Sequence, residues 1–322
     1  MPTSSRDWRR TTRPPTSRRT SCGASASGAR SIPARGPRNR SSRPGSSSSS
    51  PWCGSWPRAA AGHAKTRRGL CVNALSSGRR VIRLDLAYDG TAYAGWQVQP
   101  NVPTVQGALL AAAARVLGDD VKVVGASRTD AGVHALHQVA SLSTTNPLDA
   151  TSVARALNAM LPPDVRVLRA GEACVTFDAR RDATGKRYAY LIDAGAVAAP
   201  LLRRYAWHVP GGLDVTAMRA ALASVRGTHD FSAFCAAPGR DAMPICRLRA
   251  VHVVERRARV AIVVSGDRFL HHMVRNLVGS VVAVGRGARE VAWLADVLKS
   301  RDRRLAGPTG PAHGLTLVRV LY

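Results

Sequence analysis

Alternating apolar and polar side chains mark the start of a folded region near residue 81. Every second position from 82 to 88 is a large apolar or aromatic residue, and Asp89 followed by a glycine supplies a turn signal. A period of two residues predicts a half-buried strand over 81–88 that ends in this turn.

A helical period follows after a short polar stretch. Apolar residues over 105–117 recur at the spacing of one helix face, and they include Val105, Leu109 and Val116. Thr104 stands where an N-cap is expected, and Gly118 stands where the helix should stop. These signals predict a helix over 105–117.

The rest of the chain continues the same mixture of periods. Strands are predicted over 121–124, 138–143, 166–169, 187–192, 248–255, 259–265 and 315–321. Helices are predicted over 149–160, 214–225, 270–284 and 290–299. The order strand, helix, strand, strand, helix, strand occurs twice, so we expect an α+β fold of two ferredoxin-like halves, 81–186 and 187–322. The halves should share one mainly antiparallel sheet flanked by helices.

Residues 1–80 differ from this region because they are rich in Arg, Ser, Pro and Gly and show neither period. Such a segment cannot bury enough apolar surface to offset its ordering entropy, so a disordered tail is predicted. Three interpretations are open: a basic RNA-binding arm, an organelle transit peptide, or upstream sequence translated from a misassigned start codon. We favour the third, because recognisable pattern begins abruptly near residue 81 and Val72 is a candidate start.

Charge indicates the kind of partner. The chain has 322 residues, with 47 Lys and Arg against 20 Asp and Glu, which gives a formal charge of +27. Residues 1–80 hold 17 of the basic and one of the acidic residues, so the tail carries +16 and the remainder +11. A phosphate-rich partner is therefore expected.

Two other classes of protein are disfavoured. No apolar run approaches the roughly 18 residues that a membrane-spanning helix needs. The six cysteines form no CxxC pair, so neither a zinc module nor a disulfide framework is predicted. Reduced thiols in the cytoplasm are expected instead.

The loop 125–132 is the strongest candidate for chemistry. It offers the carboxylate of Asp130 and the guanidinium of Arg128 among small residues, directly after a predicted strand. Gly132 would allow a left-handed backbone or a close substrate approach, and loops on a rigid sheet often carry function. Arg128 could hold a phosphate or fill the space that a flipped base leaves. A surface turn with an ordinary Asp–Arg pair is the simpler alternative, and spacing alone does not separate the two.

The motif SRTDAGVHA at 127–135 resembles the signature loop of the TruA-type tRNA pseudouridine synthases. Further blocks resemble that family in its order: YDGTAYAGWQ at 88–97, TVQ at 104–106, NAMLP at 158–162, FDAR at 177–180, RYAY at 187–190, HDF at 229–231, FLHHMVRN at 269–276 and HGL at 313–315. The resemblance covers about 81–322 and leaves the tail unmatched. It implies the pseudouridine synthase fold and an isomerase that converts uridine to pseudouridine at nucleotides 38 to 40 of the tRNA anticodon arm. It also implies a homodimer that needs no metal or organic cofactor.

The resemblance assigns roles to five residues. Asp130 is implied to be the catalytic nucleophile, and Arg275 the cation that keeps it ionised, because burial alone would neutralise a carboxylate. Tyr188 is implied to stack on the flipped base, Leu315 to close the other side of the base pocket, and Arg128 to engage the RNA. Without the family, Tyr188 and Leu315 would be interpreted as core side chains and Arg128 as a solvated charge. The atom that Asp130 attacks stays open.

The histidines offer two metal-like spacings, His134 with His137 and the adjacent pair His271 and His272. Neither spacing has recognisable supporting ligands, so no metal site is predicted. We expect His134 to order its loop by hydrogen bonding, and His271 to lie one helical turn before Arg275.

Two rival functions remain to be compared with the isomerase. A non-catalytic basic RNA-binding protein of the same fold is the main alternative, and the presence of Asp130, Tyr188 and Arg275 together favours the enzyme. A hydrolase that cleaves the base away would need a second acid to activate water, and the loop offers none.

Overall fold

The computed structural model describes residues 78–236 and 243–322, which all belong to one compact unit of the chain. Residues 1–77, and with them nearly all of the predicted tail, lie outside the described residues. The strands are β1 (Arg80–Tyr88), β2 (Lys122–Gly125), β3 (His134–Thr144), β4 (Val165–Ala173), β5 (Gly185–Asp193), β6 (Trp207–His208), β7 (Gly227–Asp230), β8 (Ile245–Arg256), β9 (Arg259–Gly266) and β10 (Leu315–Leu321). The α-helices are α1 (Val105–Leu117), α2 (Ala150–Met160), α3 (Val215–Ala223), α4 (Met273–Gly285) and α5 (Trp293–Ser300). Short 3₁₀ helices are η1 (Gly90–Ala92), η2 (Pro200–Leu202), η3 (Ser232–Phe234), η4 (Arg303–Leu305) and η5 (Ala312–Gly314).

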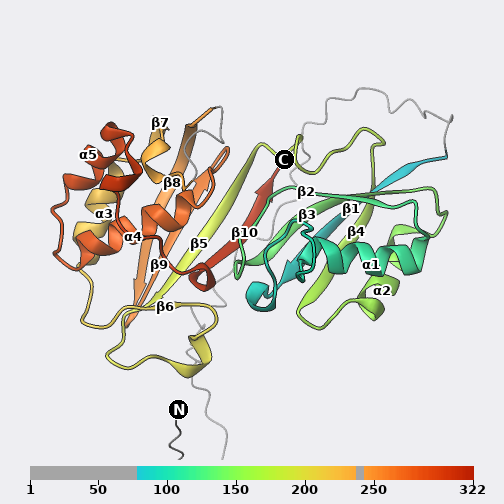
Figure 1. Cartoon of the computed structure of the whole chain (residues 1–322), viewed down its shortest axis with the longest axis horizontal. Coiled ribbons are helices and arrows are strands. Elements are labelled where there is room, and N and C mark those ends of the chain that lie inside the picture. The colour runs from blue at the N-terminus through green and yellow to red at the C-terminus, as the bar shows by residue number, and fades with distance from the viewer. Residues whose placement is uncertain (1–77, 237–242) are drawn as a thin grey trace, which may run out of the picture. The chain divides into compact units, whose positions relative to one another are not determined.

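The strands of the described residues form one sheet in the order β4-β1-β3-β10-β5-β9-β8-β7, with β2 paired to β3 and β6 paired to β5 (Figure 1). In the first half β1 lies between β3 and β4, and both pairings are antiparallel. In the second half β5 lies between β9 and β10, again antiparallel. Each half therefore repeats the ferredoxin-like arrangement, which confirms the predicted fold class.

The C-terminal strand joins the two halves. β10 runs antiparallel to β5 and also makes a short parallel pairing with β3, in which Thr316 faces His134 and Leu317 faces Ala135. Asp130 lies just before β3, and Leu315 begins β10. The junction therefore places the candidate loop at the middle of the shared sheet.

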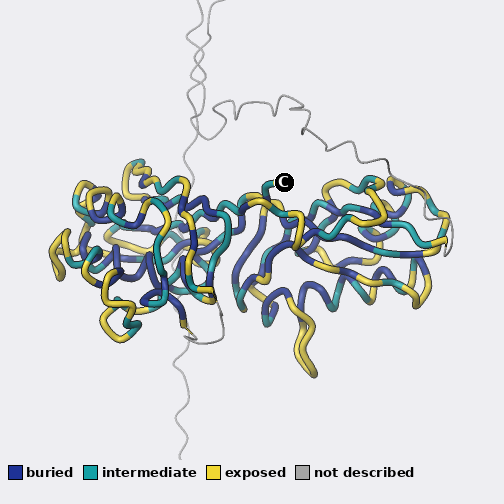
Figure 2. Tube along the Cα trace, turned by 90° about the horizontal axis from the view of Figure 1, so that it is seen from above, coloured by how far each residue is buried: buried dark blue, intermediate teal, exposed yellow. Residues whose placement is uncertain are grey.

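Helices cover the sheet in two groups, with α1 and α2 beside the first half and α3, α4 and α5 beside the second (Figure 1). Helix α1 buries the predicted face, including Val105 and Leu109. Its N-cap is Thr104, whose Oγ1 accepts a hydrogen bond from the Gly107 amide at 3.2 Å. Buried positions follow the strands and the helix faces turned toward them, while exposed positions gather at the outer turns (Figure 2).

The structure corrects two predicted helix starts, since the helix expected over 290–299 begins at Trp293 and the one expected over 270–284 also begins three residues late. The helix expected over 270–284 begins at Met273, because His272 has a left-handed backbone with φ of 59°. The expectation that His271 lies on this helix, one turn before Arg275, was therefore wrong. The short strands β6 and β7 were not predicted, because two residues and the polar sequence GTHD show no apolar period.

No helix among residues 78–236 and 243–322 is long and apolar enough to cross a membrane.

Candidate active site

One cleft of about 780 Å³ contains all five residues singled out from the sequence. They come from separate elements: Asp130 and Arg128 from the loop between β2 and β3, Tyr188 from β5, Arg275 from α4 and Leu315 from the start of β10. The two ferredoxin-like halves both contribute to its walls.

Hydrogen bonds to its backbone carbonyls hold the loop that carries Asp130 in place. The Trp96 amide donates to the Thr129 carbonyl at 3.0 Å, and the Gln138 side-chain amide donates to the Ser127 carbonyl at 2.6 Å. Gly132 adopts φ of 75°, the left-handed conformation that the sequence suggested for it. These contacts present the Asp130 carboxylate to the cleft on a fixed support.

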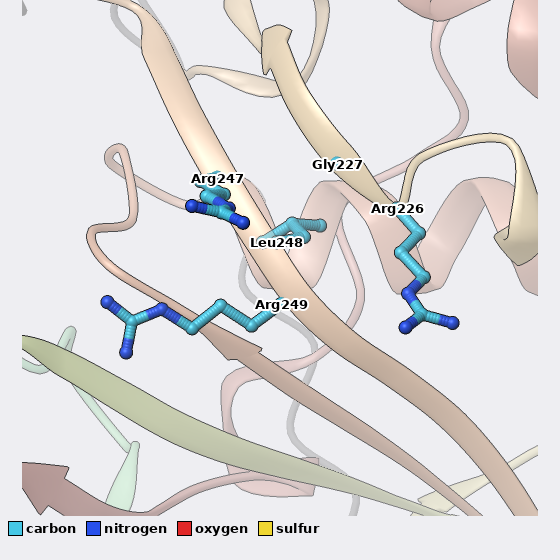
Figure 3. Close-up of a pocket in the computed structure, with 5 residues that line it drawn as sticks. All are labelled: Arg226, Gly227, Arg247, Leu248 and Arg249. Carbon is cyan, nitrogen blue, oxygen red and sulfur yellow. The ribbon is translucent and has the colours of Figure 1, made fainter.

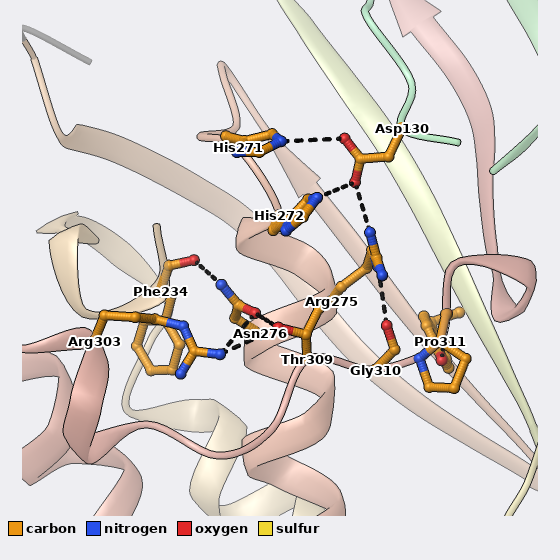
Figure 4. A network of polar contacts seen from close by, with 11 residues as sticks. Asp130, Phe234, His271, His272, Arg275, Asn276, Arg303, Thr309, Gly310 and Pro311 are labelled. Atoms are coloured by element: carbon orange, nitrogen blue, oxygen red, sulfur yellow. Dashed lines mark hydrogen bonds and ion pairs between the residues drawn. The ribbon is translucent and has the colours of Figure 1, made fainter. Parts of the chain in front are cut away.

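Asp130 forms an ion pair with Arg275 (Figure 4). Arg275 Nη1 lies 3.1 Å from Asp130 Oδ2, and its Nε donates to the Gly310 carbonyl at 2.9 Å. The Asp130 side chain is 21% exposed and that of Arg275 is 15% exposed. The two opposite charges therefore face each other in a partly buried site, where their attraction is less screened than in water.

Two histidines stand on the other side of the same carboxylate (Figure 4). His272 Nε2 lies 3.4 Å from Asp130 Oδ2, and His271 Nε2 lies 3.9 Å from Oδ1. Burial lowers the pKa of His272 below its ordinary 6.5 and outweighs the attraction of Asp130. His272 is therefore neutral at pH 7, and the permanent cation at Asp130 is Arg275.

Ligand atoms of Asp130, His271 and His272 lie within 4.8 Å of one another, a spacing that a metal ion could use. The sequence analysis considered the pair His271 and His272 but found no supporting ligand for it, because Asp130 lies 141 positions before His271 in the chain. A divalent ion there would have to compete with the guanidinium of Arg275 for the Asp130 carboxylate.

Tyr188 on β5 contacts the loop from the other half of the sheet. Its hydroxyl lies 2.7 Å from Ser127 Oγ, and its ring meets Phe269 edge-on with centroids 5.2 Å apart. Burial raises the pKa of Tyr188 from 10.0 to about 12, so the hydroxyl keeps its proton at neutral pH. Leu315 is buried and supplies an apolar part of the same lining.

The cleft also carries positive charge from several elements. Arg128 is exposed at its rim, and Arg180 and Lys186 line it. The pKa of Lys186 is lowered, first by burial and then by the nearby positive charges of Arg180 and Arg268. This gathering of cations fits a polyanionic ligand.

Sequence reasoning missed Ser127, Phe269 and the orientation of His272. The signal for Ser127 was available, since it opens the same nine-residue motif as Asp130. His134 behaves as expected and orders its loop: its Nδ1 accepts from the Gly90 amide at 3.1 Å and its Nε2 lies 3.2 Å from the His313 carbonyl oxygen.

A second hollow of about 460 Å³ lies at the edge formed by β7 and β8 (Figure 3). Its lining residues are Arg226, Gly227, Arg247, Leu248 and Arg249. It offers three guanidinium groups and no carboxylate, hydroxyl or thiol side chain, so it is not a candidate for chemistry.

Two ferredoxin-like halves that share one sheet, with the loop of Asp130 facing a basic cleft between them, define the pseudouridine synthase class of α+β enzyme. The family model described as tRNA pseudouridine synthase matches residues 86–180 and 221–322. The chain belongs to this family, as the resemblance in the sequence implied, and it is an isomerase.

Curated relatives align with this chain over most of their own length. The tRNA pseudouridine synthase A of Myxococcus xanthus is 46% identical over 242 residues, which span 75% of this chain and 91% of that protein. The one from Chloroflexus aurantiacus is 47% identical over 247 residues, 76% of this chain and 89% of that protein. The one from Thermoanaerobacter pseudethanolicus is 39% identical over 243 residues, 76% of this chain and all of that protein.

Proposed function

We propose that this enzyme converts uridine to pseudouridine at nucleotides 38 to 40 of the tRNA anticodon arm, with Asp130 as the catalytic carboxylate. The observation that carries the proposal is the ion pair of Asp130 with Arg275 in a cleft walled by Tyr188 and Leu315. Family membership supports the reaction, and the geometry supports the assignment of Asp130.

The reaction exchanges one bond for another within a nucleotide. The N1–C1′ bond breaks, the uracil turns and C5 joins C1′; C5 then loses its proton, and N1 takes one up. Asp130 is suited to start this sequence, because Arg275 stabilises its negative charge in a partly desolvated site. The exchange is redox-neutral, so we expect no organic cofactor and no metal.

Tyr188 is placed to bind the flipped base and to take part in the loss of the C5 proton. Its hydroxyl is protonated and hydrogen-bonded to Ser127 Oγ. It can accept the C5 proton only if its own proton passes to Ser127 Oγ and the Ser127 proton passes on to solvent at the same time. Leu315 would limit the movement of the base within the cleft.

The RNA would be held mainly through its phosphates. Arg128, Arg180 and Lys186 line the cleft, and residues 81–322 carry a formal charge of +11. A uridine must leave its stack to reach Asp130, and Arg128 at the rim is placed to occupy the vacated space. Recognition by shape and backbone fits a substrate whose sequence varies.

Three further expectations remain part of the proposal. We propose that 81–186 and 187–322 act as two halves of one catalytic body, which the shared sheet supports. We also propose a homodimer and a cytoplasmic location, which family membership supports. Light scattering on the purified chain tests the homodimer, since its mass should be twice that of one chain.

Mapping the product tests the proposed function. An unmodified tRNA transcript with uridines at 38 to 40 is incubated with the full chain and treated with a carbodiimide, which leaves a stable adduct on pseudouridine that stops reverse transcription. We expect stops for nucleotides 38 to 40, and none on a transcript with cytidines there. Salt-sensitive binding without any stop would favour the non-catalytic RNA-binding alternative.

A further inference from the structure

A buried polar network lies behind the ion pair and joins α4 to the segment that precedes β10 (Figure 4). Its centre is Asn276, the residue after Arg275, which has no exposed surface. Asn276 Nδ2 donates to the Phe234 carbonyl at 2.7 Å. Asn276 Oδ1 accepts from Thr309 Oγ1 at 2.6 Å and from Arg303 Nη2 at 3.1 Å. The amide nitrogen and the amide oxygen of Asn276 thus both have partners, which fixes the orientation of the side chain.

The same segment is packed directly on the backbone of α4. A Cβ at Gly279 would lie 1.7 Å from the Pro308 carbonyl oxygen, so only glycine allows this approach. One residue further, Ser280 Oγ donates to the Asn276 carbonyl at 2.8 Å and accepts from the Gly307 amide at 2.9 Å. The segment is therefore fixed relative to the helix that carries Arg275.

This segment contacts the Arg275 side chain through Gly310, the neighbour of Thr309. The Gly310 carbonyl accepts from Arg275 Nε at 2.9 Å, and the Gly310 amide donates to the Arg275 carbonyl at 3.0 Å. A continuous set of contacts therefore runs from Asn276 through Thr309 and Gly310 to the guanidinium that meets Asp130.

We propose that Asn276 and Thr309 are positioning residues, which fix the Gly310 carbonyl and thereby the orientation in which Arg275 meets Asp130. The inference rests on the proposed function of Asp130. Apolar side chains could fill the same space, but they could not impose one orientation, whereas directional hydrogen bonds in a buried network favour a single arrangement. Displacement of a catalytic group by about 1 Å can lower a rate by about 100-fold.

The test uses Thr309→Val, which keeps the shape of the side chain and removes the hydroxyl that binds Asn276 Oδ1. We expect kcat for pseudouridine formation to fall by about tenfold or more, while KM for tRNA stays within about twofold, because the cleft lining is unchanged. Thr309→Ser restores the hydroxyl and should recover kcat to within about threefold of wild type.

Two controls separate positioning from a general loss of stability. Val153→Ala removes buried volume from α2, outside the cleft and the network, and should lower the unfolding temperature without lowering kcat. The second control is the Arg275→Lys background, because the substituted side chain lacks Nε and cannot bind the Gly310 carbonyl in the same way. In this background Thr309→Val should lower kcat by less than about threefold.

The outcomes are distinct. A loss of kcat in Thr309→Val, its recovery in Thr309→Ser and its absence in the Arg275→Lys background would support the positioning role. If the wild type is active and Thr309→Val has the same kcat, this inference is overturned and the proposed function stands. The same holds if Thr309→Val lowers kcat equally in both backgrounds. An inactive wild type would overturn the proposed function and this inference with it.

Discussion

Arg275 Nη1 lies 3.1 Å from Asp130 Oδ2, although 145 positions separate the two residues along the chain. Asp130 belongs to the first ferredoxin-like half and Arg275 to the second. The two halves share one sheet because β10 pairs with both β3 and β5. The charge pair at the centre of the cleft therefore exists only when the junction at β10 is formed.

Replacing Arg275 by alanine should abolish most of the activity. The substitution leaves the Asp130 carboxylate in a partly buried site without its partner cation, and removing one member of such a pair is costly. We expect kcat to fall by about 100-fold or more. The matched control is Arg155→Ala on α2, whose guanidinium donates to Ser152 Oγ and lies outside the cleft. A loss below about tenfold for Arg275→Ala would contradict the role given to the ion pair.

Tyr188 should make the folded state sensitive to alkaline pH. The pKa of Tyr188 is about 12 in the folded protein, against the ordinary tyrosine value of 10.0 that applies to the unfolded chain. Between these values the folded state binds more protons than the unfolded state, so stability is full below pH 10 and falls as pH rises through this window. One such group contributes a slope of up to about 1.4 kcal/mol per pH unit.

Urea unfolding at a series of alkaline pH values measures this effect. The free energy of unfolding of Tyr188→Phe should fall less steeply above pH 10 than that of wild type. Identical slopes for the two proteins would show that Tyr188 does not retain its proton in this way.

Arg128 should contribute affinity for RNA through phosphate contact. Arg128→Ala should reduce the slope of log affinity against log salt concentration by about one, because one phosphate contact is lost. The measurement is tRNA binding at several salt concentrations. Arg289→Ala is the matched control, since Arg289 packs on the ring of Trp293 at 5.3 Å and does not line the cleft. An unchanged slope for Arg128→Ala would place this guanidinium away from the RNA backbone.

Thr104 should stabilise the fold without affecting catalysis. Its side chain caps α1 by accepting from the Gly107 amide, and loss of such a cap typically costs about 1 kcal/mol. Thr104→Ala should lower the free energy of unfolding in urea by about this amount and leave kcat unchanged. A change in kcat at full occupancy of the folded state would indicate that α1 positions the loop of Asp130.

Local periodicity predicted most of the secondary structure, because apolar faces and helix caps depend only on residues that are close together in the sequence. The bounds of α1 follow from Thr104 and Gly118, and those of β10 match the prediction. The start of α4 does not, because His272 has a left-handed backbone and the apolar pattern of the helix gives no signal of that interruption. Strand β7 likewise depends on pairing with β8.

The candidate site likewise has a part that the sequence predicted and a part that it did not. The residue types at 128, 130, 188, 275 and 315 were accessible through the motif in which each lies, and the structure brings them into one cleft. The contacts of Asn276, Thr309 and Gly310 join segments more than 30 positions apart, so no local pattern could reveal them. They become visible only once α4 and the segment before β10 are packed together.

The most direct test of Asp130 compares wild type with Asp130→Asn on a tRNA transcript carrying tritium at uridine C5. The substitution keeps the size of the side chain and removes its charge, and C5 releases its hydrogen only when the new carbon–carbon bond forms. We predict tritium release by the wild type and none by Asp130→Asn, with both proteins binding the tRNA. Release by Asp130→Asn at a rate near that of wild type would contradict the central role of this carboxylate.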